Sequence, residues 1–404
     1  MANQSTTFPK GWKITTLREV ADIFDSKRIP LSSSERSKRK GPYPYYGASD
    51  IVDWIDDYIF DGEYLLISED GENLNTRNTS IAFIAKGKFW VNNHAHVLKG
   101  KESHLNKYLS WYFSILDINP YISGAVQPKL SKTNLESIPI LISQNQEEHR
   151  AIAAVLSSLD DKIELLREQN KTLEATAQAI FKEWFVNFNF PGSPGKMIDS
   201  ELGEIPKGWR IGGLGDEVET VLGGTPSTEK KEYWKNGNIP WINSGKVNDF
   251  RIYEPTSYIT ERALNESAAK LMPKGTIVIA ITGATLGQVS RLEIDSTGNQ
   301  SVIGIIPNEK FSSVYLFYWM LENVSTIINT ATGGAQQHIN KNDVNGSDFI
   351  VPTNDILKKY YEGVNPMMEK ISSNCFQIQT LSKLRDTLLP KLMKGEVRVE
   401  GFKE

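Results

Sequence analysis

The sequence predicts an α+β protein that contains two globular segments, each followed by a long helix. An apolar residue recurs at alternating steps of four and three positions through residues 152–184, and the same spacing returns in the last fifty residues. This spacing is typical of the seam of a coiled coil. The two globular segments also begin with nearly the same peptide. Together these observations indicate an internal duplication, with a pseudo-two-fold repeat of one domain and one helix.

The first long helix is expected at about residues 144–187, inside a helical region of 144–190. Its flanks carry charged and polar residues, as a solvent-facing surface should. A helix of this length measures roughly 60 Å at ~1.5 Å per residue, and it cannot bury its apolar stripe alone. It therefore needs a partner helix. Its predicted seam contains one polar residue, Asn170, among the apolar residues Leu159, Ile163, Leu166, Leu173, Ile180 and Trp184.

The C-terminal region supplies that partner, and we assign residues 354–404 to a second long helix with a tail. Asn365 followed by Pro366 predicts the helix start, because proline is tolerated at the first helical position. Pro390 predicts a kink near the helix end. A shift of 208 residues places Ile163 on Ile371. The predicted seam of this second helix contains Ile371, Ile378, Leu381, Leu388 and Leu392.

The globular segments, residues 1–143 and 191–353, open with PKGWKITTL at 9–17 and PKGWRIGGL at 206–214. Trp12 and Trp209 in these peptides are expected to anchor the chain in the two cores. A linker rich in proline and glycine near residues 188–206 marks the boundary between the repeats. The centres of the segments differ in sequence. The duplication therefore predicts one frame that carries two binding surfaces of different specificity.

Composition places the chain among soluble proteins of a reducing compartment. Hydrophobic residues make up 39% and charged residues 23%, both ordinary values. Neither a membrane-spanning run nor a signal peptide is recognisable, so we expect a cytoplasmic protein with no membrane contact. The single Cys375 excludes an internal disulfide. The net charge of −4 argues against broad non-specific binding to nucleic acid, so any such contact must be local.

One basic stretch stands out in the first segment, at residues 26–47. Its cations face a single acid, Glu35, and prolines and serines predict a loop that ends in tyrosines. Such a loop suits contacts with DNA phosphates, and the alternative is an ordinary solvated loop. The cations are Lys27, Arg28, Arg36, Lys38, Arg39 and Lys40.

Polar residues gather where predicted strands end. His94 and His96 lie two positions apart, so on a strand they would face the same side. Without an acid or cysteine at a recognisable interval we predict no metal site there. A hydrogen bond to a core carbonyl or to DNA is the expected role of these histidines. In the second segment, an apolar strand at 277–281 ends in a turn that exposes Thr282 and Thr285.

The sequence carries no catalytic signature, and we predict a binding protein with no catalytic residues. A phosphate-binding GxxxxGK[ST] loop is missing, and so is the strand–GxGxxG–helix context of a dinucleotide site. Asn119-Pro120-Tyr121 matches only half of the Asn-Pro-Pro-Tyr loop of adenine methyltransferases. The five histidines give no recognisable triad.

The helix ends AQAIFKEWFVNFNFP (177–191) and LRDTLLPKLMKGEVRV (384–399), together with the two PKGW starts, resemble the specificity subunit of type I restriction-modification systems. The resemblance spans essentially the whole chain. It implies two target-recognition domains separated by two long helices that pair as an antiparallel coiled coil. Each domain would read one half of a bipartite, asymmetric DNA target, and the helices would set the gap between the halves.

The resemblance also implies partners and cofactors. Two methyltransferase subunits would dock on the helices, and restriction–translocase subunits would complete the complex. Adenosylmethionine, ATP and magnesium would be bound by those partners and none by this chain. Two alternatives stay open on the residues alone: a coiled-coil scaffold with two protein-binding adaptor domains, and a fragment of a fused restriction–methylation enzyme.

Site residues follow from the resemblance in two groups. Phosphate contacts would come from the six cations of residues 26–47 and, in the second domain, from Lys246 and Lys341. Base readout would come from polar turn residues, since Asn and Gln can pair with adenine edges. Each of these side chains could instead satisfy the backbone of its own turn. The predicted readers are Asn92, Asn93, His94, His96, Gln127, Thr282, Thr285, Asn299, Gln300, Gln336 and Gln337.

Overall fold

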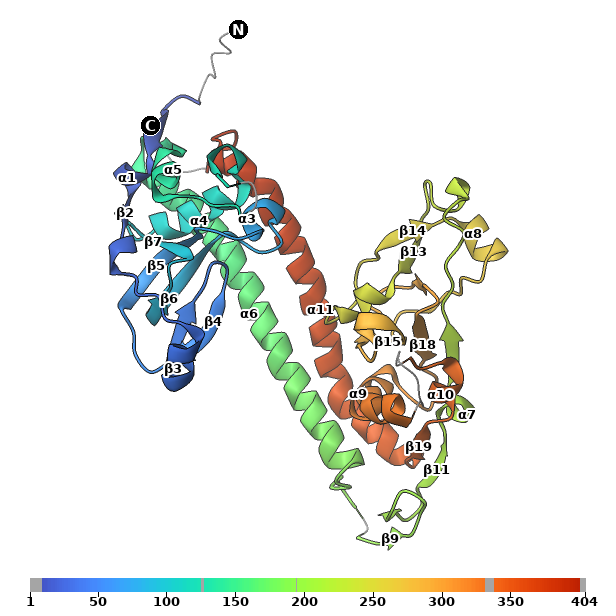
Figure 1. Cartoon of the computed structure of the whole chain (residues 1–404). Coiled ribbons are helices and arrows are strands. Elements are labelled where there is room, and N and C mark those ends of the chain that lie inside the picture. The colour runs from blue at the N-terminus through green and yellow to red at the C-terminus, as the bar shows by residue number, and fades with distance from the viewer. Residues whose placement is uncertain (1–8, 125–126, 194, 331–337, 400–404) are drawn as a thin grey trace. The chain divides into compact units, whose positions relative to one another are not determined.

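The computed structural model describes residues 9–124, 127–193, 195–330 and 338–399, and it divides into two compact units. The first unit contains residues 1–163 and 380–404, and the second contains residues 164–379. Each unit holds one globular domain and a part of each long helix (Figure 1). No helix among the described residues is long and apolar enough to cross a membrane.

The globular domain of the first unit is built on a six-stranded sheet in the order β2-β7-β5-β6-β3-β4, with α4 packed on β5, β6 and β7. Its elements are β1 (Trp12–Thr16), α1 (Leu17–Val20), β2 (Ala21–Ile23), η1 (Asp25–Lys27), α2 (Ser33–Lys38), β3 (Lys40–Tyr46), β4 (Ile51–Ile55), β5 (Phe60–Ser68), α3 (Asn73–Thr76), β6 (Ala82–Val91), β7 (Ala95–Gly100), α4 (Leu105–Ile115), η2 (Asn119–Tyr121), α5 (Lys132–Ser137) and β8 (Pro139–Ser143).

The second domain has a four-stranded sheet, β12-β18-β15-β16, and a three-stranded sheet, β14-β13-β17. Its elements are β9 (Met197–Ile198), β10 (Ile205–Pro206), β11 (Arg210–Gly213), α7 (Leu214–Glu217), β12 (Glu219–Leu222), η3 (Lys231–Tyr233), β13 (Ile239–Ile242), η4 (Ser244–Asn248), β14 (Ser257–Ile259), α8 (Glu261–Glu266), β15 (Ile277–Ala280), η5 (Gly283–Thr285), β16 (Val289–Arg291), β17 (Thr297–Gly298), β18 (Val302–Ile306), α9 (Ser313–Thr330), α10 (Lys341–Asn345) and β19 (Asp348–Val351).

The two domains share one strand order even where their sequences differ. The order β2-β7-β5-β6 of the first domain corresponds to β12-β18-β15-β16 of the second. Each domain also has a hairpin with one strand in a parallel pair. In the first domain the hairpin is β3–β4, and β3 pairs with the end of β6; in the second it is β13–β14, and β13 pairs with β17. The central strand β15 is buried along its whole length because both of its faces are covered: Ile277 and Ile279 belong to one apolar core, and Val278 and Ala280 belong to another. The predicted divergence of the centres therefore concerns sequence and not strand order.

The shared PKGW peptide opens each domain on a two-stranded sheet, β1 with β8 and β11 with β19. Trp12 is 6% exposed and Trp209 is 4% exposed, so both are the buried anchors that the sequence predicts. Trp12 lies against Gly395, just past the end of the second long helix, where an added Cβ would meet the indole ring at 2.7 Å. Trp209 stacks on Phe190, just past the first long helix, at 5.2 Å between ring centroids. In each unit, therefore, the tryptophan of the PKGW peptide packs against the end of the helix from the other repeat.

The long helices are α6 (Gln146–Phe185) and α11 (Asn354–Met393), each of 40 residues. The predicted start of the second helix at Asn365 is wrong, because α11 begins eleven residues earlier and continues through Pro366. Pro366 lies on an exposed face of α11, where water can hydrogen-bond to the carbonyl that proline leaves without a donor. The helix also continues past Pro390 to Met393, and the kink predicted at Pro390 stays a prediction. Gly395 terminates the helix in a left-handed conformation with φ +67°.

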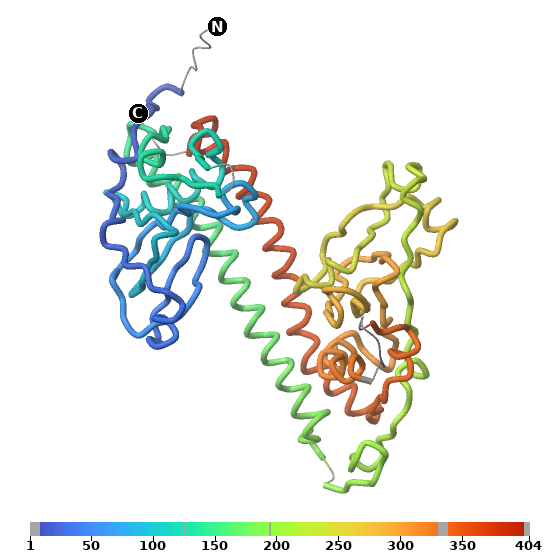
Figure 2. Tube along the Cα trace, in the orientation of Figure 1, coloured from blue at the N-terminus to red at the C-terminus, as the bar shows by residue number. Residues whose placement is uncertain are grey.

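Within each unit the two helices run in opposite directions, and the predicted α+β fold with its antiparallel helix pair is confirmed. In the first unit the N-terminal part of α6 shares a core with the C-terminal end of α11, and Arg385 binds Asp160 at 2.9 Å. In the second unit the later part of α6 lies beside the earlier part of α11 (Figure 2). The twelve predicted seam residues are buried or half-buried; Ile163, Leu166, Asn170, Ile371, Ile378 and Leu392 are buried, and Leu159, Leu173, Ile180, Trp184, Leu381 and Leu388 are half-buried.

The polar seam residue Asn170 meets a second asparagine, Asn374. The Nδ2 of Asn374 donates to Oδ1 of Asn170 at 2.9 Å, and both side chains are buried. Among the described residues the Oδ1 of Asn374 has no partner, so the pair is only partly satisfied. Such a pair favours one register of the helices, at a cost in stability.

Asn170→Ala is therefore expected to lower the free energy of unfolding by about 1–3 kcal/mol, because it removes the 2.9 Å bond of the buried Asn374 amide and leaves it only the 3.4 Å bond to Gln169. The double variant Asn170→Leu, Asn374→Leu should recover this loss, since it removes both polar groups together. Urea denaturation of the full chain measures both. Equal losses in the single and double variants would contradict the role assigned to the pair.

A second polar pair, a half-buried His104 and a buried His149, lies where α4 meets α6. Nε2 of His104 and Nδ1 of His149 are 2.6 Å apart, and burial together with the neighbouring His104 lowers the pKa of His149 to about 4. The equivalent positions of the second repeat are Phe311 and Leu357, which are both buried and apolar. The histidine pair is thus packed in its neutral form.

Stability should consequently fall as the pH drops from about 6.5 towards 4, because the unfolded chain takes up protons that the folded pair resists. The variant His104→Phe, His149→Leu copies the second repeat and should flatten this part of the pH profile. Denaturation midpoints at pH 7.5 and 5 compare the two proteins. An identical decline in both would show that other groups govern the acid sensitivity.

Candidate nucleic-acid interface

Four loops of the first domain meet at one end of its sheet. They comprise residues 47–50 between β3 and β4, residues 69–73 after β5, residues 92–94 between β6 and β7, and residues 127–130. The first three loops follow or precede a strand of the sheet, and residues 127–130 are bonded through their main chain to the loop after β5. The loops are therefore held by rigid elements, as binding surfaces commonly are.

Main-chain hydrogen bonds connect these loops to one another. The N–H of Glu69 donates to the carbonyl of His94 at 2.8 Å, and the N–H of Leu130 donates to the carbonyl of Glu69 at 2.7 Å. The N–H of Asn92 donates to the carbonyl of Tyr46 at 3.1 Å. The structure thus brings Asn92, Asn93, His94 and Gln127, which the sequence predicts as readers, onto one loop cluster.

The second domain repeats the pattern with different residues. The N–H of Ile281 donates to the carbonyl of Ser301 at 3.0 Å, and that of Ile339 donates to the carbonyl of Ile281 at 3.2 Å. The N–H of Asn299 donates to the carbonyl of Ile242 at 2.9 Å. The predicted readers Thr282, Thr285, Asn299 and Gln300 lie on this second cluster. The two clusters therefore occupy equivalent places in the two domains.

The asparagines that open the central turns shape those turns. Oδ1 of Asn92 accepts from the N–H of His94 at 2.8 Å, and Oδ1 of Asn299 accepts from the N–H of Ser301 at 3.1 Å. Asn92 is also only 8% exposed. For these two residues the structure favours the alternative role, a side chain that satisfies its own turn. The exposed side chains at the tips are Asn93 and Gln300.

The prediction that His94 and His96 face the same side of a strand is wrong. β7 begins at Ala95, so His94 belongs to the turn, is exposed, and binds Asp70 through Nδ1 at 2.8 Å. His96 is completely buried, and its Nε2 lies 2.8 Å from the carbonyl oxygen of Leu130. A ring without exposed surface cannot contact DNA, so His96 is removed from the predicted readers. The hydrogen bond to a core carbonyl is the role that the structure gives it.

His96 also completes a set of possible metal ligands with Asp25 and Glu69, whose ligand atoms lie within 4.8 Å of one another. The guanidinium of Arg28 already binds a carboxylate of this set, because its Nη1 lies 2.7 Å from Oε2 of Glu69. The carboxylates are thus balanced by protein cations, as buried acids must be in the absence of other charge.

The predicted basic loop is wrong as a loop, because residues 33–38 form α2 and residues 40–46 form β3. Its cations pair with acids that come later in the chain, in strand β4 of the β3–β4 hairpin and directly after it. Asp53 pairs with Arg36 at 3.2 Å and Lys40 at 2.5 Å, and Asp56 pairs with Arg39 at 2.9 Å. An ion pair with a carboxylate weakens the electrostatic attraction between these cations and a DNA phosphate. Their role as phosphate contacts stays a prediction.

The remaining predicted residues occupy varied positions. Lys27 lies over the Phe24 ring at 5.1 Å, and Lys38 is exposed at the end of α2. Lys246 pairs with Asp249 at 2.8 Å. Lys341 is half-exposed at the start of α10, and Gln127 is exposed. Gln336 and Gln337 lie outside the described residues.

The clusters also contain polar residues that the sequence prediction omitted. Asp70 orients His94, and Lys129 pairs with Glu69 at 3.2 Å while its side chain remains 51% exposed. In the second domain Oγ1 of Thr225 lies 2.5 Å from Oε1 of Gln300. The loop 47–50 was missed because its Gly-Ala-Ser-Asp composition is that of any turn. Two hydrogen bonds tie it to the cluster, from Ser68 Oγ to the carbonyl of Ala48 at 2.6 Å and from Asn73 Nδ2 to Ser49 Oγ at 3.3 Å.

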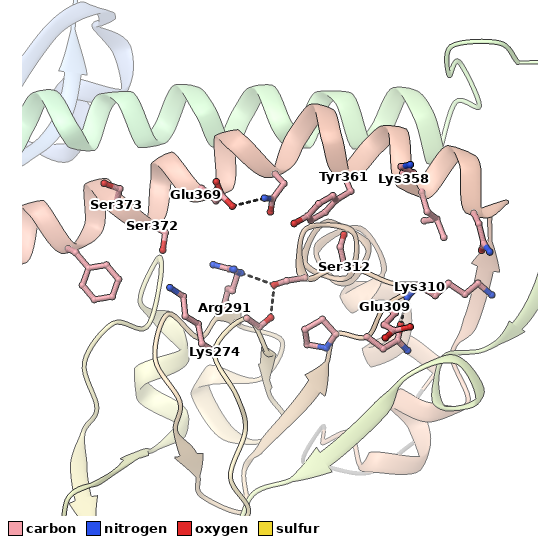
Figure 3. Close-up of a pocket in the computed structure, with 18 residues that line it drawn as sticks. Lys274, Arg291, Glu309, Lys310, Ser312, Lys358, Tyr361, Glu369, Ser372 and Ser373 are labelled. Carbon is pink, nitrogen blue, oxygen red and sulfur yellow. Dashed lines mark hydrogen bonds between the residues drawn. The ribbon is translucent and has the colours of Figure 1, made fainter.

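A polar groove of about 1250 Å³ lies in the second unit, between α11 and the start of α9 (Figure 3). Four cations and two acids line it, and its innermost cation, Arg291, is bound by Glu293 at 2.5 Å and by Ser313 at 2.7 Å. Neither histidine nor cysteine is among its lining residues. Its charged lining residues are Lys274, Arg291, Lys310, Lys358, Glu309 and Glu369.

Two domains with equivalent loop clusters and unlike exposed side chains define a duplicated recognition protein. The family model described as "Type I restriction modification DNA specificity domain" matches residues 9–175 and 206–377, one match for each repeat. The chain therefore belongs to this family of DNA specificity proteins of type I restriction-modification systems.

Similar proteins agree with this assignment. The type I restriction enzyme MjaIX specificity subunit of Methanocaldococcus jannaschii is 28% identical over 97% of this chain and 95% of that protein. A putative type I restriction enzyme specificity subunit of Haemophilus influenzae is 29% identical over 97% and 94%. The crystal structure of the specificity subunit from M. genitalium has the same fold, with a TM-score of 0.65, 15% identity, and coverage of 97% and 98%.

The two tip residues provide a test of the loop clusters. Asn93→Ala should reduce discrimination between specific and non-specific DNA by about 1–3 kcal/mol, as loss of one base contact does, without moving the unfolding midpoint. Gln300→Ala should do the same for a different part of the target. Asn92→Ala should instead lower the unfolding midpoint, because it removes a turn hydrogen bond.

Competition binding with specific and non-specific duplexes, alongside denaturation, measures these effects. Gln377→Ala, an exposed glutamine on α11, serves as the matched control and should change neither quantity. Unaltered discrimination in both tip variants would show that the bases are read elsewhere.

Proposed function

We propose that each domain reads one half of a bipartite, asymmetric DNA target through its loop cluster. The observation that carries this proposal is the repeated hydrogen-bond frame with different exposed side chains. The first cluster offers Asn93, His94 and Gln127, whereas the second offers Thr282 and Gln300. One frame with two unlike surfaces suits two different half-sites. The family membership favours this function over a scaffold with protein-binding adaptor domains.

We further propose that α6 and α11 act as a spacer and as a docking frame for two methyltransferase subunits. Restriction–translocase subunits would join the assembly through them. Each long helix buries only one stripe in its own unit and leaves charged residues exposed along the rest of its length. Adenosylmethionine, ATP and magnesium would belong to the partner subunits, and this chain would contribute recognition alone.

Charge supports a shared interface with DNA. The first domain carries 17 basic and 16 acidic residues, and residues 191–353 carry 14 and 18, so the second domain is acidic. Most cations of the first domain's basic stretch are already paired. We therefore expect the methyltransferase subunits to supply many of the phosphate contacts, while this chain supplies the base contacts.

Methylation mapping tests the proposed function directly. The chain is expressed with its methyltransferase partner, and methylated adenines are mapped across the host genome. We expect a split motif of two short half-sites with a fixed gap, which appears only when the chain is present. A stable complex that yields no such motif would contradict the proposal.

The spacer role predicts a change in the gap when both helices are shortened together. Removal of residues 161–167 and 377–383 deletes one heptad from each helix and keeps the phase of the seam. At ~1.5 Å per residue this shortens the helices by about 10 Å, or about three base pairs of DNA. The tolerated gap should shrink, or methylation should be lost. An unchanged gap would exclude the spacer role.

A further inference from the structure

The loops of the first domain rest on a buried ion cluster formed by Asp25, Arg28, Glu69 and His96. Nδ1 of His96 lies 2.7 Å from Oδ2 of Asp25, and Nη1 of Arg28 donates to Oε2 of Glu69 at 2.7 Å. Nη2 of Arg28 also lies 3.5 Å from Asp25. His96 is fully buried, and the Arg28 side chain is 13% exposed. Two carboxylates therefore contact the Arg28 guanidinium and the His96 ring beneath the loops.

The cluster ties three of the four loops by direct bonds. Arg28 Nη1 donates to the carbonyl of Ala95 at 2.7 Å, directly behind the turn at 92–94. His96 Nε2 bonds the carbonyl of Leu130, in the segment 127–130, at 2.8 Å. Glu69 belongs to the loop after β5, and its main chain bonds both of the other loops. Movement of one member would therefore disturb all three loops together.

Arg28 has few donors left for a phosphate. Its Nε donates to the carbonyl of Asp25 at 3.1 Å, and its Nη1 serves both Glu69 and Ala95. Release of the guanidinium would take one partner from each of two largely buried acids, leaving Glu69 with Lys129 and Asp25 with His96, which is unfavourable. Burial opposes ionisation of Asp25, yet the hydrogen bond and charge of His96 hold the pKa of that carboxyl below its usual value. The predicted role of Arg28 as a phosphate contact is thus replaced by an internal one.

The second domain has no such cluster at the equivalent place. The shared hydrogen bonds place Ile281 at the position of Glu69, Ile303 at that of His96, and Ile339 at that of Leu130. Ile281, Ile303 and Ile339 are at most 5% exposed and belong to one apolar core. Equivalent loops therefore rest on charges in one domain and on aliphatic side chains in the other. This contrast provides an internal control within one chain.

We propose that Arg28, with Glu69 and His96, positions the reading loops of the first domain, so that base discrimination by that domain alone depends on this ion cluster. The inference rests on the proposed function, because it concerns how one half-site is read. Arg28 is a positioning residue here and touches no base. Ions can fix direction more narrowly than aliphatic contacts, since each hydrogen bond has a preferred geometry.

Two variants test the proposal in the full chain with its methyltransferase partner. Arg28→Lys keeps the charge but offers one nitrogen in place of the three guanidinium nitrogens that contact Asp25, Glu69 and Ala95. Glu69→Gln keeps the shape and removes one charge of the cluster. Arg18→Lys is the matched control, because Arg18 is an exposed arginine whose side chain is 70% accessible. Selection of bound DNA from a randomised pool gives the preference at each half-site.

Both variants should relax the half-site read by the first domain by about tenfold and leave the other half-site unchanged. The Asn93→Ala and Gln300→Ala variants identify which half belongs to which domain. The slope of log affinity against log salt should stay as in the unmodified protein, because no phosphate contact is lost. Hydrogen exchange should quicken in peptides covering 91–95 and 127–131, and should not change in 299–302.

Several results would overturn the proposal. A third variant, Arg28→Gln, removes the charge; a salt slope reduced by about one unit in this variant, with an intact motif, would make Arg28 a phosphate contact after all. Equal relaxation of both half-sites would show a general loss of stability. Unchanged exchange in the first-domain loops would show that the cluster does not hold them. If the unmodified protein selects no bipartite motif, the proposed function fails, and the exchange comparison still decides whether the cluster positions the loops.

Discussion

The burial of two long apolar stripes is the constraint on which the rest of this structure depends. Neither α6 nor α11 can hide its stripe within its own length, so each needs the other. Pairing in opposite directions brings the end of each helix to the first strand of a domain. There Trp12 meets Gly395 and Trp209 meets Phe190. One packing requirement thus links the helices to the placement of both domains' first strands.

In both domains, main-chain hydrogen bonds fix the positions of the loops, whereas the side chains at the loop tips differ. The main-chain bonds of Glu69 with His94 and Leu130 recur as those of Ile281 with Ser301 and Ile339. Because these bonds use only N–H and C=O groups, they tolerate different residues at the tips. A duplicated gene can therefore acquire a second specificity while it keeps the same strand order.

The sequence predicted the features that depend on local periodicity or on short peptides. The seam through Ile163 and Ile371, the two tryptophan anchors and the polar turn at 92–94 all follow from neighbours in the chain. The start of α11 was misplaced because Asn365-Pro366 is a typical helix start when read locally. Burial of Val364 and Met368 on either side of the proline carries the helix through it.

The sequence could not predict which charges were already paired. Arg28 and His96 lie in a basic and polar context along the chain, yet their partners Glu69 and Leu130 come from strands and loops more than thirty positions away. The same limit applies to Arg36 and Lys40, which share Asp53. A count of charged residues along a sequence does not show which charges form ion pairs in the folded chain. Pairing in the folded chain decides which cations can still meet a phosphate.

The two loop clusters rest on different kinds of contact, an ion cluster in the first domain and aliphatic side chains in the second. Aliphatic packing under the second cluster is non-directional, so small shifts of Ile281 or Ile303 cost little. The hydrogen bonds of the ion cluster under the first are directional. Because each member bonds two or three other groups, loss of one member disturbs the whole cluster. The first domain therefore gains a fixed loop geometry but accepts few changes beneath its loops, whereas the second can accommodate new tip residues by small adjustments of its core. Two copies of one frame can differ in this way in how readily each acquires a new target, even though their backbone bonds are the same.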